Sequence, residues 1–154
     1  KTHNLKSVGL RFFTVYGPWG RPDMAPFLFV ESAINKKSIN VFNYGNQKRD
    51  FTYIDDIVLS IFLLFKNEDL IKNSTILNIG NGSPSNLEDF LNIIERETGS
   101  LLDKKYIKAQ KGDVAITYAD TSKLESIINF KPNTSLESGI KSFVNWYRKF
   151  YNIK

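Results

Sequence analysis

The segment of residues 10–23 constrains the fold of this chain more than any other. An apolar run at residues 8–13 leads into a stretch in which glycine and proline recur, and Thr14, Tyr16 and Arg21 stand among them. Apolar runs bounded by such residues are typical of β-strands. The pattern predicts a strand that opens into a loop, and such loops hold ligands in α/β proteins because the sheet fixes both of their ends. An ordinary strand-to-helix connection is the alternative.

The remainder of the chain alternates between short apolar segments and segments with apolar residues at helical spacing. Further strands are expected at residues 39–41, 49–54, 76–79 and 106–107 and near Tyr118. Helices are expected to begin at Pro26, at Asp55 or Asp56, and after Ser85, Ser122 and Thr134. A hairpin-like turn is expected at Gly45 and Asn46. Strands that alternate with helices indicate an α/β fold, here one compact unit without a linker or repeat.

Three of these helices carry a capping signal, because a Ser or Thr followed three residues later by Glu satisfies N–H groups of the first turn. The pairs are Ser85 with Glu88, Ser122 with Glu125, and Thr134 with Glu137. Gly99 is expected to end the helix that follows Ser85. Gly80 and Gly82 suggest a dinucleotide-binding turn. We reject that interpretation because Ser85 replaces the third glycine and Pro84 intrudes.

Composition excludes several classes of site. The chain has 154 residues, 42% hydrophobic and 24% charged, as expected for one soluble globular domain. It has no cysteine, which excludes disulfides and thiolate chemistry, and its single histidine, His3, cannot form a metal cluster. No apolar run reaches the length of about 18 residues that spans a membrane. We therefore expect a cytoplasmic protein that binds neither a membrane nor a metal ion.

The formal net charge of +5 raises the question of nucleic-acid binding. The lysines are scattered over different predicted elements, and the sequence has no long basic tract. This distribution favours a solvated surface over a nucleic-acid interface, so no nucleic-acid partner is expected. A surplus of positive charge also suits a small phosphorylated ligand.

The sequence contains no Ser-His-Asp or Cys-His set and no phosphate-binding glycine loop with Lys-Ser/Thr. The polar residues that stand out are suited to binding rather than to acid–base catalysis: Thr14, Arg21, Arg49, Gln110 and Asp113. Arg49 is the best candidate for a phosphate contact, because a guanidinium group can hold two oxygens at once. The alternative is that Arg49 forms a surface ion pair with Asp50 or Asp56.

Two long stretches, residues 10–24 and residues 45–56, resemble the C-terminal half of an extended short-chain dehydrogenase/reductase. Within that superfamily they are most similar to the NAD-dependent nucleotide-sugar epimerases. The Gly-Pro-Trp-Gly-Arg-Pro-Asp-Met signature at residues 17–24 is most similar to the UDP-glucuronate 4-epimerases. Residues 80–84 and 112–113 follow in the family's order, so the resemblance covers almost the whole chain. It implies the last strands of a Rossmann-like sheet plus the smaller α/β substrate-binding domain.

The resemblance implies an isomerase that holds NAD tightly, oxidises a UDP-sugar transiently at C4 and returns the hydride to the other face. Such enzymes bind NAD on an N-terminal Rossmann domain and catalyse with a Tyr-x-x-x-Lys pair, and neither motif occurs here. Residues 1–154 are therefore expected to be the C-terminal sugar-nucleotide-binding part, inactive alone, with the NAD-binding part and the catalytic pair before Lys1. The parent protein is expected to be a cytoplasmic homodimer that acts on UDP-glucuronate in polysaccharide biosynthesis.

The same resemblance implies roles for seven residues. Cofactor binding is implied for Phe12 and Phe13, and substrate binding for Thr14, Arg21, Arg49, Gln110 and Asp113. Arg49 would hold the diphosphate and Asp113 the ribose of uridine, whereas Gln110 stands where related enzymes have an arginine. Thr14 would meet the C6 carboxylate of the sugar, and Arg21 would pair with it or order the loop from behind. The alternatives are a sugar-nucleotide 4,6-dehydratase or decarboxylase, or a non-catalytic sugar-nucleotide-binding module.

Overall fold

A computed structural model describes residues 6–71 and 74–153, and the expectation for His3 lies outside them. The strands are β1 (Val8–Phe12), β2 (Thr14–Tyr16), β3 (Ser38–Val41), β4 (Lys48–Arg49), β5 (Phe51–Tyr53), β6 (Thr75–Ile79), β7 (Ser85–Asn86) and β8 (Asp103–Tyr106). The helices are α1 (Ala25–Asn35), α2 (Ile54–Lys66), α3 (Leu87–Thr98), α4 (Ser122–Ile128) and α5 (Leu136–Phe150), with the 3-10 turns η1 (Phe42–Gly45) and η2 (Glu68–Leu70). Over the described ranges, none of these helices is long and apolar enough to cross a membrane.

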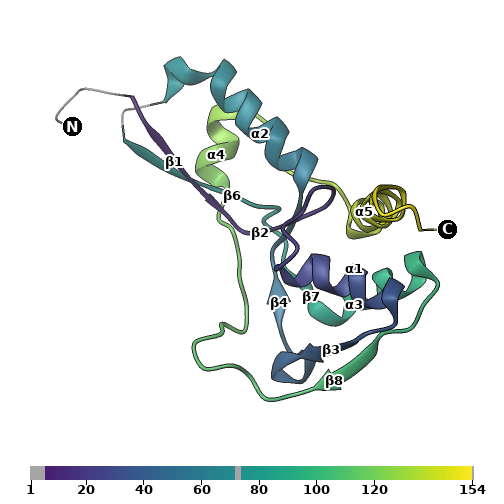
Figure 1. Cartoon of the computed structure of the whole chain (residues 1–154). Coiled ribbons are helices and arrows are strands. Elements are labelled where there is room, and N and C mark those ends of the chain that lie inside the picture. Colours follow the sequence, from purple (N-terminus) through teal and green to yellow (C-terminus); the bar gives the residue numbers. More distant parts are fainter. Residues whose placement is uncertain (1–5, 72–73, 154) are drawn as a thin grey trace.

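At one end of the molecule, β1 and β6 pair in parallel, and α2 and α4 lie next to them (Figure 1). We call these four elements the β1–β6 unit. Aliphatic side chains form the buried cluster of this end: Ile57, Leu64, Ile71, Leu77, Ile79, Leu124 and Ile128. The strands expected at residues 8–13 and 76–79 correspond to β1 and β6. Their parallel pairing brings the carboxyl ends of both strands to one edge, as in a Rossmann-like sheet.

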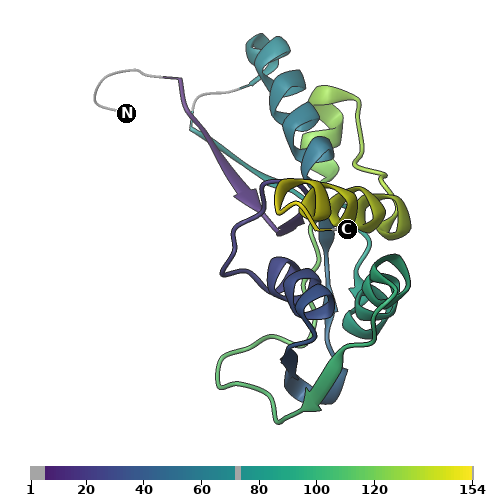
Figure 2. The same ribbon diagram turned by 45° about the vertical axis from the view of Figure 1, so that its right-hand side comes forward.

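The helices α1, α3 and α5, with β3, β5 and β8, form a second group that we call the α1–α3–α5 unit. Helix α3 contacts both α1 and α5, and Figure 2 shows α5 above the other two. Aromatic rings fill this core: Phe51 stacks on Phe90 with centroids 4.2 Å apart, and Tyr16 lies edge-on to both. Five apolar residues at helical spacing on α5 face the same core: Leu136, Ile140, Phe143, Val144 and Tyr147. Helical spacing of apolar residues therefore determines how α5 packs.

The pairing of the strands differs from the expected hairpin. Strand β3 pairs in parallel with β8, and β4 pairs antiparallel with β7, so β3 and β4 are not partners. Between them η1 turns the chain, with Asn43, Tyr44 and Gly45 at φ of 50°, 52° and 80°. Three successive residues in the left-handed region turn the backbone away from the path of a two-residue hairpin. The hairpin predicted at Gly45 and Asn46 is therefore wrong.

The single strand predicted at residues 49–54 is two strands with different partners. Strand β4 pairs with β7, whereas β5 pairs in parallel with β2. The N-cap residue of α2 is Tyr53 rather than Asp55 or Asp56, and both acidic residues lie in the first turn of the helix. Asp56 is buried and accepts a hydrogen bond from the backbone N–H of Thr134 at 3.0 Å. This carboxylate fixes the chain that approaches α5 and does not cap its own helix.

The capping residues of the three later helices are each displaced by one position. The N-cap residues of α3, α4 and α5 are Asn86, Thr121 and Ser135, in place of the predicted Ser85, Ser122 and Thr134. Ser135 Oγ accepts a hydrogen bond from the N–H of Ser138 at 3.2 Å. Neighbouring polar residues compete for such positions, and spacing alone does not decide between them. Gly99 ends α3 in the left-handed conformation, with φ of 69°, as predicted.

The two units meet at Asp50, which is fully buried between β4 and β5. Its carboxylate accepts hydrogen bonds from the backbone N–H groups of Asn81, Gly82 and Ala119 at 2.8, 3.0 and 2.9 Å. Its backbone carbonyl accepts one from the N–H of Thr14 at 3.1 Å. A buried carboxylate is stable when several N–H donors surround it. Asp50 therefore joins the start of β2, the end of β6 and the segment before α4.

The segment between β8 and α4 runs beside β4 without forming the strand expected near Tyr118. The N–H of Lys48 donates to the carbonyl of Ala115 at 2.9 Å, and the N–H of Thr117 donates to the carbonyl of Lys48 at 3.1 Å. These bonds make one isolated parallel bridge. They place Asp113, which precedes them closely in the chain, next to β4.

Candidate functional site

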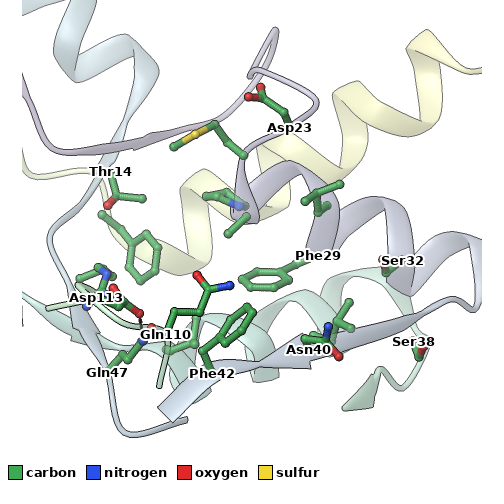
Figure 3. Close-up of a pocket in the computed structure, with 18 residues that line it drawn as sticks. Thr14, Asp23, Phe29, Ser32, Ser38, Asn40, Phe42, Gln47, Gln110 and Asp113 are labelled. Atoms are coloured by element: carbon green, nitrogen blue, oxygen red, sulfur yellow. Dashed lines mark hydrogen bonds and ion pairs between the residues drawn. The ribbon is translucent and has the colours of Figure 1, made fainter. Parts of the chain in front are cut away.

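A cavity of about 570 Å³ opens beside α1, between β2, β3 and the segment that follows β8 (Figure 3). Thr14 and Asp113 lie at one end of it, and Ser32 and Ser38 lie at the other. Residues far apart in the sequence meet here because β2 pairs with β5 and β3 pairs with β8. The cavity has the size of a site for a small molecule or cofactor.

Four of the seven predicted site residues line this cavity: Thr14, Arg49, Gln110 and Asp113. They come from β2, from β4 and from the loop after β8. The other three, Phe12, Phe13 and Arg21, are not part of its lining. The structure thus gathers the residues that the resemblance assigns to the sugar nucleotide, except Arg21, whereas the two that it assigns to the cofactor do not line the cavity.

Arg49 and Asp113 form an ion pair at one end of the cavity. Arg49 Nη2 lies 2.7 Å from Asp113 Oδ1, and Nη1 donates to the carbonyls of Lys48 and Ala115 at 3.0 and 3.3 Å. The side-chain amide of Gln47 donates to the other carboxylate oxygen of Asp113. The side chains of the ion pair are 15% and 28% exposed, so solvent screens them only in part. The guanidinium of Arg49 is therefore held in one orientation.

Sequence reasoning missed parts of this arrangement. The alternative that paired Arg49 with Asp50 or Asp56 is wrong, because its partner is Asp113 and Asp50 is enclosed by backbone N–H groups. Gln47 was not selected, although it is 8% exposed and holds Asp113. Its only sequence signal is its place in the second stretch that resembles the epimerases.

Arg21 lies outside the cavity lining and pairs with Asp23, which is part of that lining. The pair is bidentate, with Nη2 2.5 Å from one carboxylate oxygen and Nε 3.1 Å from the other. The hydrogen bond from Arg21 lowers the pKa of Asp23 below its usual value, although both side chains are exposed. Of the two roles left open for Arg21, this geometry matches ordering of the loop.

Phe12 and Phe13 lie at the carboxyl end of β1, directly before Thr14. The side chain of Phe12 is 50% exposed, and the N–H of Phe13 donates to the carbonyl of Ile79 in β6 at 3.3 Å. Dinucleotides bind outside the carboxyl ends of parallel strands in open α/β sheets. These two residues therefore fit a cofactor site at the edge of the sheet, next to the cavity rather than inside it.

The part of the cavity away from Arg49 has aromatic walls and polar ends that sequence reasoning did not select. Phe29 of α1 and Phe42 of η1 line it, together with Ser32, Ser38 and Asn40. Helical spacing places Phe29 and Ser32 on one face of α1, which was the signal available in the sequence. Aromatic faces next to hydroxyl and amide groups are suited to a planar polar ring.

The cavity offers binding groups and lacks a recognisable acid–base pair. Among the described residues, no group of three or more histidine or carboxylate side chains could hold a metal ion. Arg49 provides a cation at one end, and hydroxyl, amide and carboxylate groups follow along its length. The arrangement is suited to an elongated ligand with an anionic centre and several hydroxyl groups.

Known proteins of similar sequence and structure are longer than this chain. Protein CapI of Staphylococcus aureus is 44% identical over 164 residues, which cover 97% of this chain and 49% of that protein. UDP-glucuronate 4-epimerase 4 of Arabidopsis thaliana is 40% identical, over 97% of this chain and 38% of that protein. The UDP-glucuronic acid 4-epimerase from Bacillus cereus, solved in complex with UDP-glucuronic acid and NAD, is 32% identical with a TM-score of 0.83, over 92% of this chain and 45% of that chain.

The chain thus spans about half the length, or less, of the proteins to which it is similar. These comparisons confirm the α/β fold class with a Rossmann-like arrangement of parallel strands. They also confirm the resemblance to the NAD-dependent nucleotide-sugar epimerases. A family model matches residues 1–80, which is more than half of the chain. This chain belongs to the NAD dependent epimerase/dehydratase family.

Proposed function

We propose that this chain is the C-terminal, substrate-binding part of an NAD-dependent UDP-sugar 4-epimerase that acts on UDP-glucuronate. The observation that carries the proposal is the cavity in which Thr14, Arg49, Gln110 and Asp113 meet. The similar proteins support it, since those of Arabidopsis thaliana and Bacillus cereus are UDP-glucuronate 4-epimerases. NAD, when bound, would supply the hydride acceptor and donor for C4 of the sugar, and the residues of this chain would hold the sugar nucleotide against it.

NAD would be held mainly by a Rossmann domain outside residues 1–154, and the greater length of the similar proteins supports this division. Phe12 and Phe13 would meet the cofactor at the carboxyl end of β1, where the half-exposed ring of Phe12 offers an apolar surface. The Tyr-x-x-x-Lys pair would lie in the same outside part. The contribution of this chain is then to bind and orient the sugar nucleotide against the cofactor.

In this proposal Arg49 would hold the diphosphate. Its hydrogen bonds to Lys48, Ala115 and Asp113 occupy three of its five N–H donors within the described part of the chain. The Nε–H and one Nη2–H are left for ligand oxygens. Asp113 orients the guanidinium and keeps lone pairs that ribose hydroxyl groups can use. Because Gln110 is neutral, the diphosphate would meet one arginine at this end rather than two.

Thr14 would recognise the C6 carboxylate of the uronate. An ionised acid that enters a partly dry cavity is stable only where donors meet it. The backbone N–H of Thr14 is already used by Asp50, so the hydroxyl group is the donor that this residue can offer. Arg21 offsets the negative charge of Asp23, which would otherwise repel a second carboxylate in the cavity.

The parent protein would be a cytoplasmic homodimer, and its product would serve polysaccharide biosynthesis. The absence of cysteine from the sequence is compatible with a reducing compartment. The homodimer and the biosynthetic role rest on the resemblance to the nucleotide-sugar epimerases. The scattered lysines give no support to a nucleic-acid partner.

Calorimetric titration of the chain with UDP and with UDP-glucuronate tests the proposal. Thr14→Val should lower the affinity for UDP-glucuronate about tenfold, which is the scale of one lost hydrogen bond to a charged group. It should leave the affinity for UDP unchanged. Arg49→Lys should weaken both ligands, because an ammonium group cannot reproduce the guanidinium fork. Thr134→Val and Arg96→Lys are matched controls outside the cavity and should leave both affinities unchanged.

Two results would contradict parts of the proposal. Preference for UDP-glucose over UDP-glucuronate would contradict the uronate assignment, and failure to bind any UDP-sugar would contradict the whole. With NAD added, the chain alone is expected to form no C4 epimer, so measurable epimerisation would show that the chemistry does not depend on an outside part. Loss of water from the sugar in the parent protein would favour the dehydratase alternative.

A further inference from the structure

The loop between β2 and α1, residues 17–24, is held mainly by contacts within itself. The N–H of Gly20 donates to the carbonyl of Gly17, and the N–H of Met24 donates to the carbonyl of Arg21, both at 3.1 Å. The ion pair of Arg21 with Asp23 is also internal to the loop. These bonds determine the shape of the loop. The end of the loop is also tied to α1, because the carbonyl of Met24 accepts hydrogen bonds from the N–H groups of Phe27 and Leu28 at 3.0 Å each.

Ring contacts join the middle of the loop to α5. The indole of Trp19 lies 5.4 Å from the ring of Trp146 and 5.1 Å from that of Phe150, centroid to centroid. Trp146 and Phe150 stack on each other at 5.2 Å, one helical turn apart, and form a surface that we call the α5 shelf. Such aromatic pairs contribute more to stability than the burial of their apolar area alone.

The backbone of Trp19 indicates that this contact imposes a conformation on the loop. Its φ is 62°, in the left-handed region, which is an outlier for a bulky aromatic residue. A residue persists in such a conformation only where its surroundings hold it there. The side chain is nevertheless 74% exposed, so burial in a core does not provide that restraint. Within the described residues, the α5 shelf provides the ring contacts of Trp19.

The end of the same loop forms part of the cavity. Asp23 and Met24 line it, followed by Ala25 and Pro26 at the start of α1. Figure 3 shows Asp23 on the loop, across the cavity from Gln47. The rim therefore lies between two anchors: the start of α1, which follows Met24 directly, and the contact of Trp19 with α5, four residues before Asp23.

We propose that Trp19 is a positioning residue: its contact with the α5 shelf holds residues 17–24 so that Asp23 and Met24 form the rim of the ligand cavity. The identity of the ligand, UDP-glucuronate, rests on the proposed function. Trp19 acts through the loop and α5 and need not touch the ligand. The proposal connects the last turn of α5 to affinity in a cavity that this turn does not line.

Four single variants test this role. Trp19→Ala removes the indole, and Phe150→Ala removes part of the α5 shelf without changing the loop. Trp19→Phe keeps an aromatic ring at the contact. Phe65→Ala is the matched control, because Phe65 lies on α2, is 72% exposed, like Trp19, and does not line the cavity.

Amide hydrogen exchange of residues 17–24 and calorimetric affinity for UDP-glucuronate are the two measurements. Trp19→Ala and Phe150→Ala should each speed amide exchange in the loop and lower the affinity for UDP-glucuronate by roughly three- to tenfold. Trp19→Phe should recover most of the affinity, and Phe65→Ala should change neither quantity. The double variant Trp19→Ala/Phe150→Ala should be no weaker than Trp19→Ala, because the first substitution already removes the contact.

Other results of these two measurements would contradict one specific step of the proposal. Unchanged loop exchange in Phe150→Ala would show that the shelf does not hold the loop, whatever the ligand. Faster exchange with unchanged affinity would show that the loop does not position the rim, and either result overturns the inference. If the wild-type chain binds no UDP-sugar, the proposed function is wrong, and the exchange comparison still decides whether the rings hold the loop.

Discussion

The α1–α3–α5 unit buries most of its large apolar side chains, whereas the β1–β6 unit leaves many of them on the surface. Phe90, Ile94, Ile140 and Phe143 are at most 1% exposed in the first unit. Large apolar side chains stay exposed in the second: Phe12, Val58, Leu59, Ile61, Phe62, Phe65 and Ile76. Helix α2 is apolar around most of its circumference, while α3 and α5 each have one apolar face. The stability of this chain should therefore come mainly from the unit that borders the cavity.

The sharpest test of this difference removes one phenylalanine from each unit. Phe90→Ala should lower the free energy of unfolding by about 3–5 kcal/mol, because it leaves a void next to Phe51 in a closed core. Phe62→Ala on α2, where the ring is 50% exposed, should cost less than about 1 kcal/mol. Urea denaturation followed by circular dichroism measures both. Equal losses would show that the two units contribute alike.

Substitution of Asp50, where the two units meet, should destabilise the chain nearly as much. Asp50→Asn replaces acceptor oxygens by an amide whose NH2 group faces backbone N–H donors, so it should cost about 3 kcal/mol. Asp69→Asn, at an exposed carboxylate in η2, is the control and should be neutral. Denaturation measured by both fluorescence and circular dichroism would show whether the units still unfold together. If Asp50→Asn left the free energy of unfolding unchanged, contacts other than those of Asp50 would hold the two units together.

Two glycines provide a third comparison. A Cβ on Gly139 in α5 would meet the hydroxyl of Tyr16 and lie 2.8 Å from its Cζ, whereas one on Gly9 in β1 would lie 3.5 Å from Ile76. Gly139→Ala should therefore lose about 1–3 kcal/mol through overpacking. Gly9→Ala should leave the melting temperature nearly unchanged. A tolerated Gly139→Ala would show that the aromatic core is looser than its geometry indicates.

The smallest expected effect is a loss of stability at alkaline pH. Burial raises the pKa of Tyr16 well above its ordinary value, with a further contribution from the nearby Tyr53 hydroxyl. The unfolded chain would ionise this phenol above about pH 10 while the folded chain would not. The stabilisation is thus complete below pH 10 and is lost as the pH rises toward the folded pKa. Thermal melts of wild type and Tyr16→Phe at increasing pH should diverge, and parallel curves would contradict the assignment.

Much of the fold could be predicted because its elements have strong local patterns. Pro26 marked the start of α1, and Gly99 marked the end of α3. The caps were displaced because Thr134 and Ser135 are adjacent and chemically alike. The hairpin was wrong because the partner of β3 is β8, and no local rule identifies a partner so far away in sequence.

The candidate site was predicted in outline for a different reason. Arg49 and Asp113 stood out by charge and by resemblance, and the structure brings them into one ion pair. Gln47 and Asp50 were missed because their importance comes from tertiary contacts that do not show in sequence. Arg21 was placed near the ligand by resemblance, yet its carboxylate partner, Asp23, is two residues away in the same loop.

The strand pairing also bears on how the chain folds as it is synthesised. Val8 pairs with Thr75 and Ser38 with Asp103, so β1 and β3 find their partners only after long stretches of chain have followed them. The described strands are joined by crossovers rather than hairpins, so local pairing cannot start the process, and loop closure should make folding slow. On the ribosome, β1 would leave the exit tunnel long before β6. Its apolar residues would be exposed during that interval, and we expect this strand to be the segment that most needs chaperone protection.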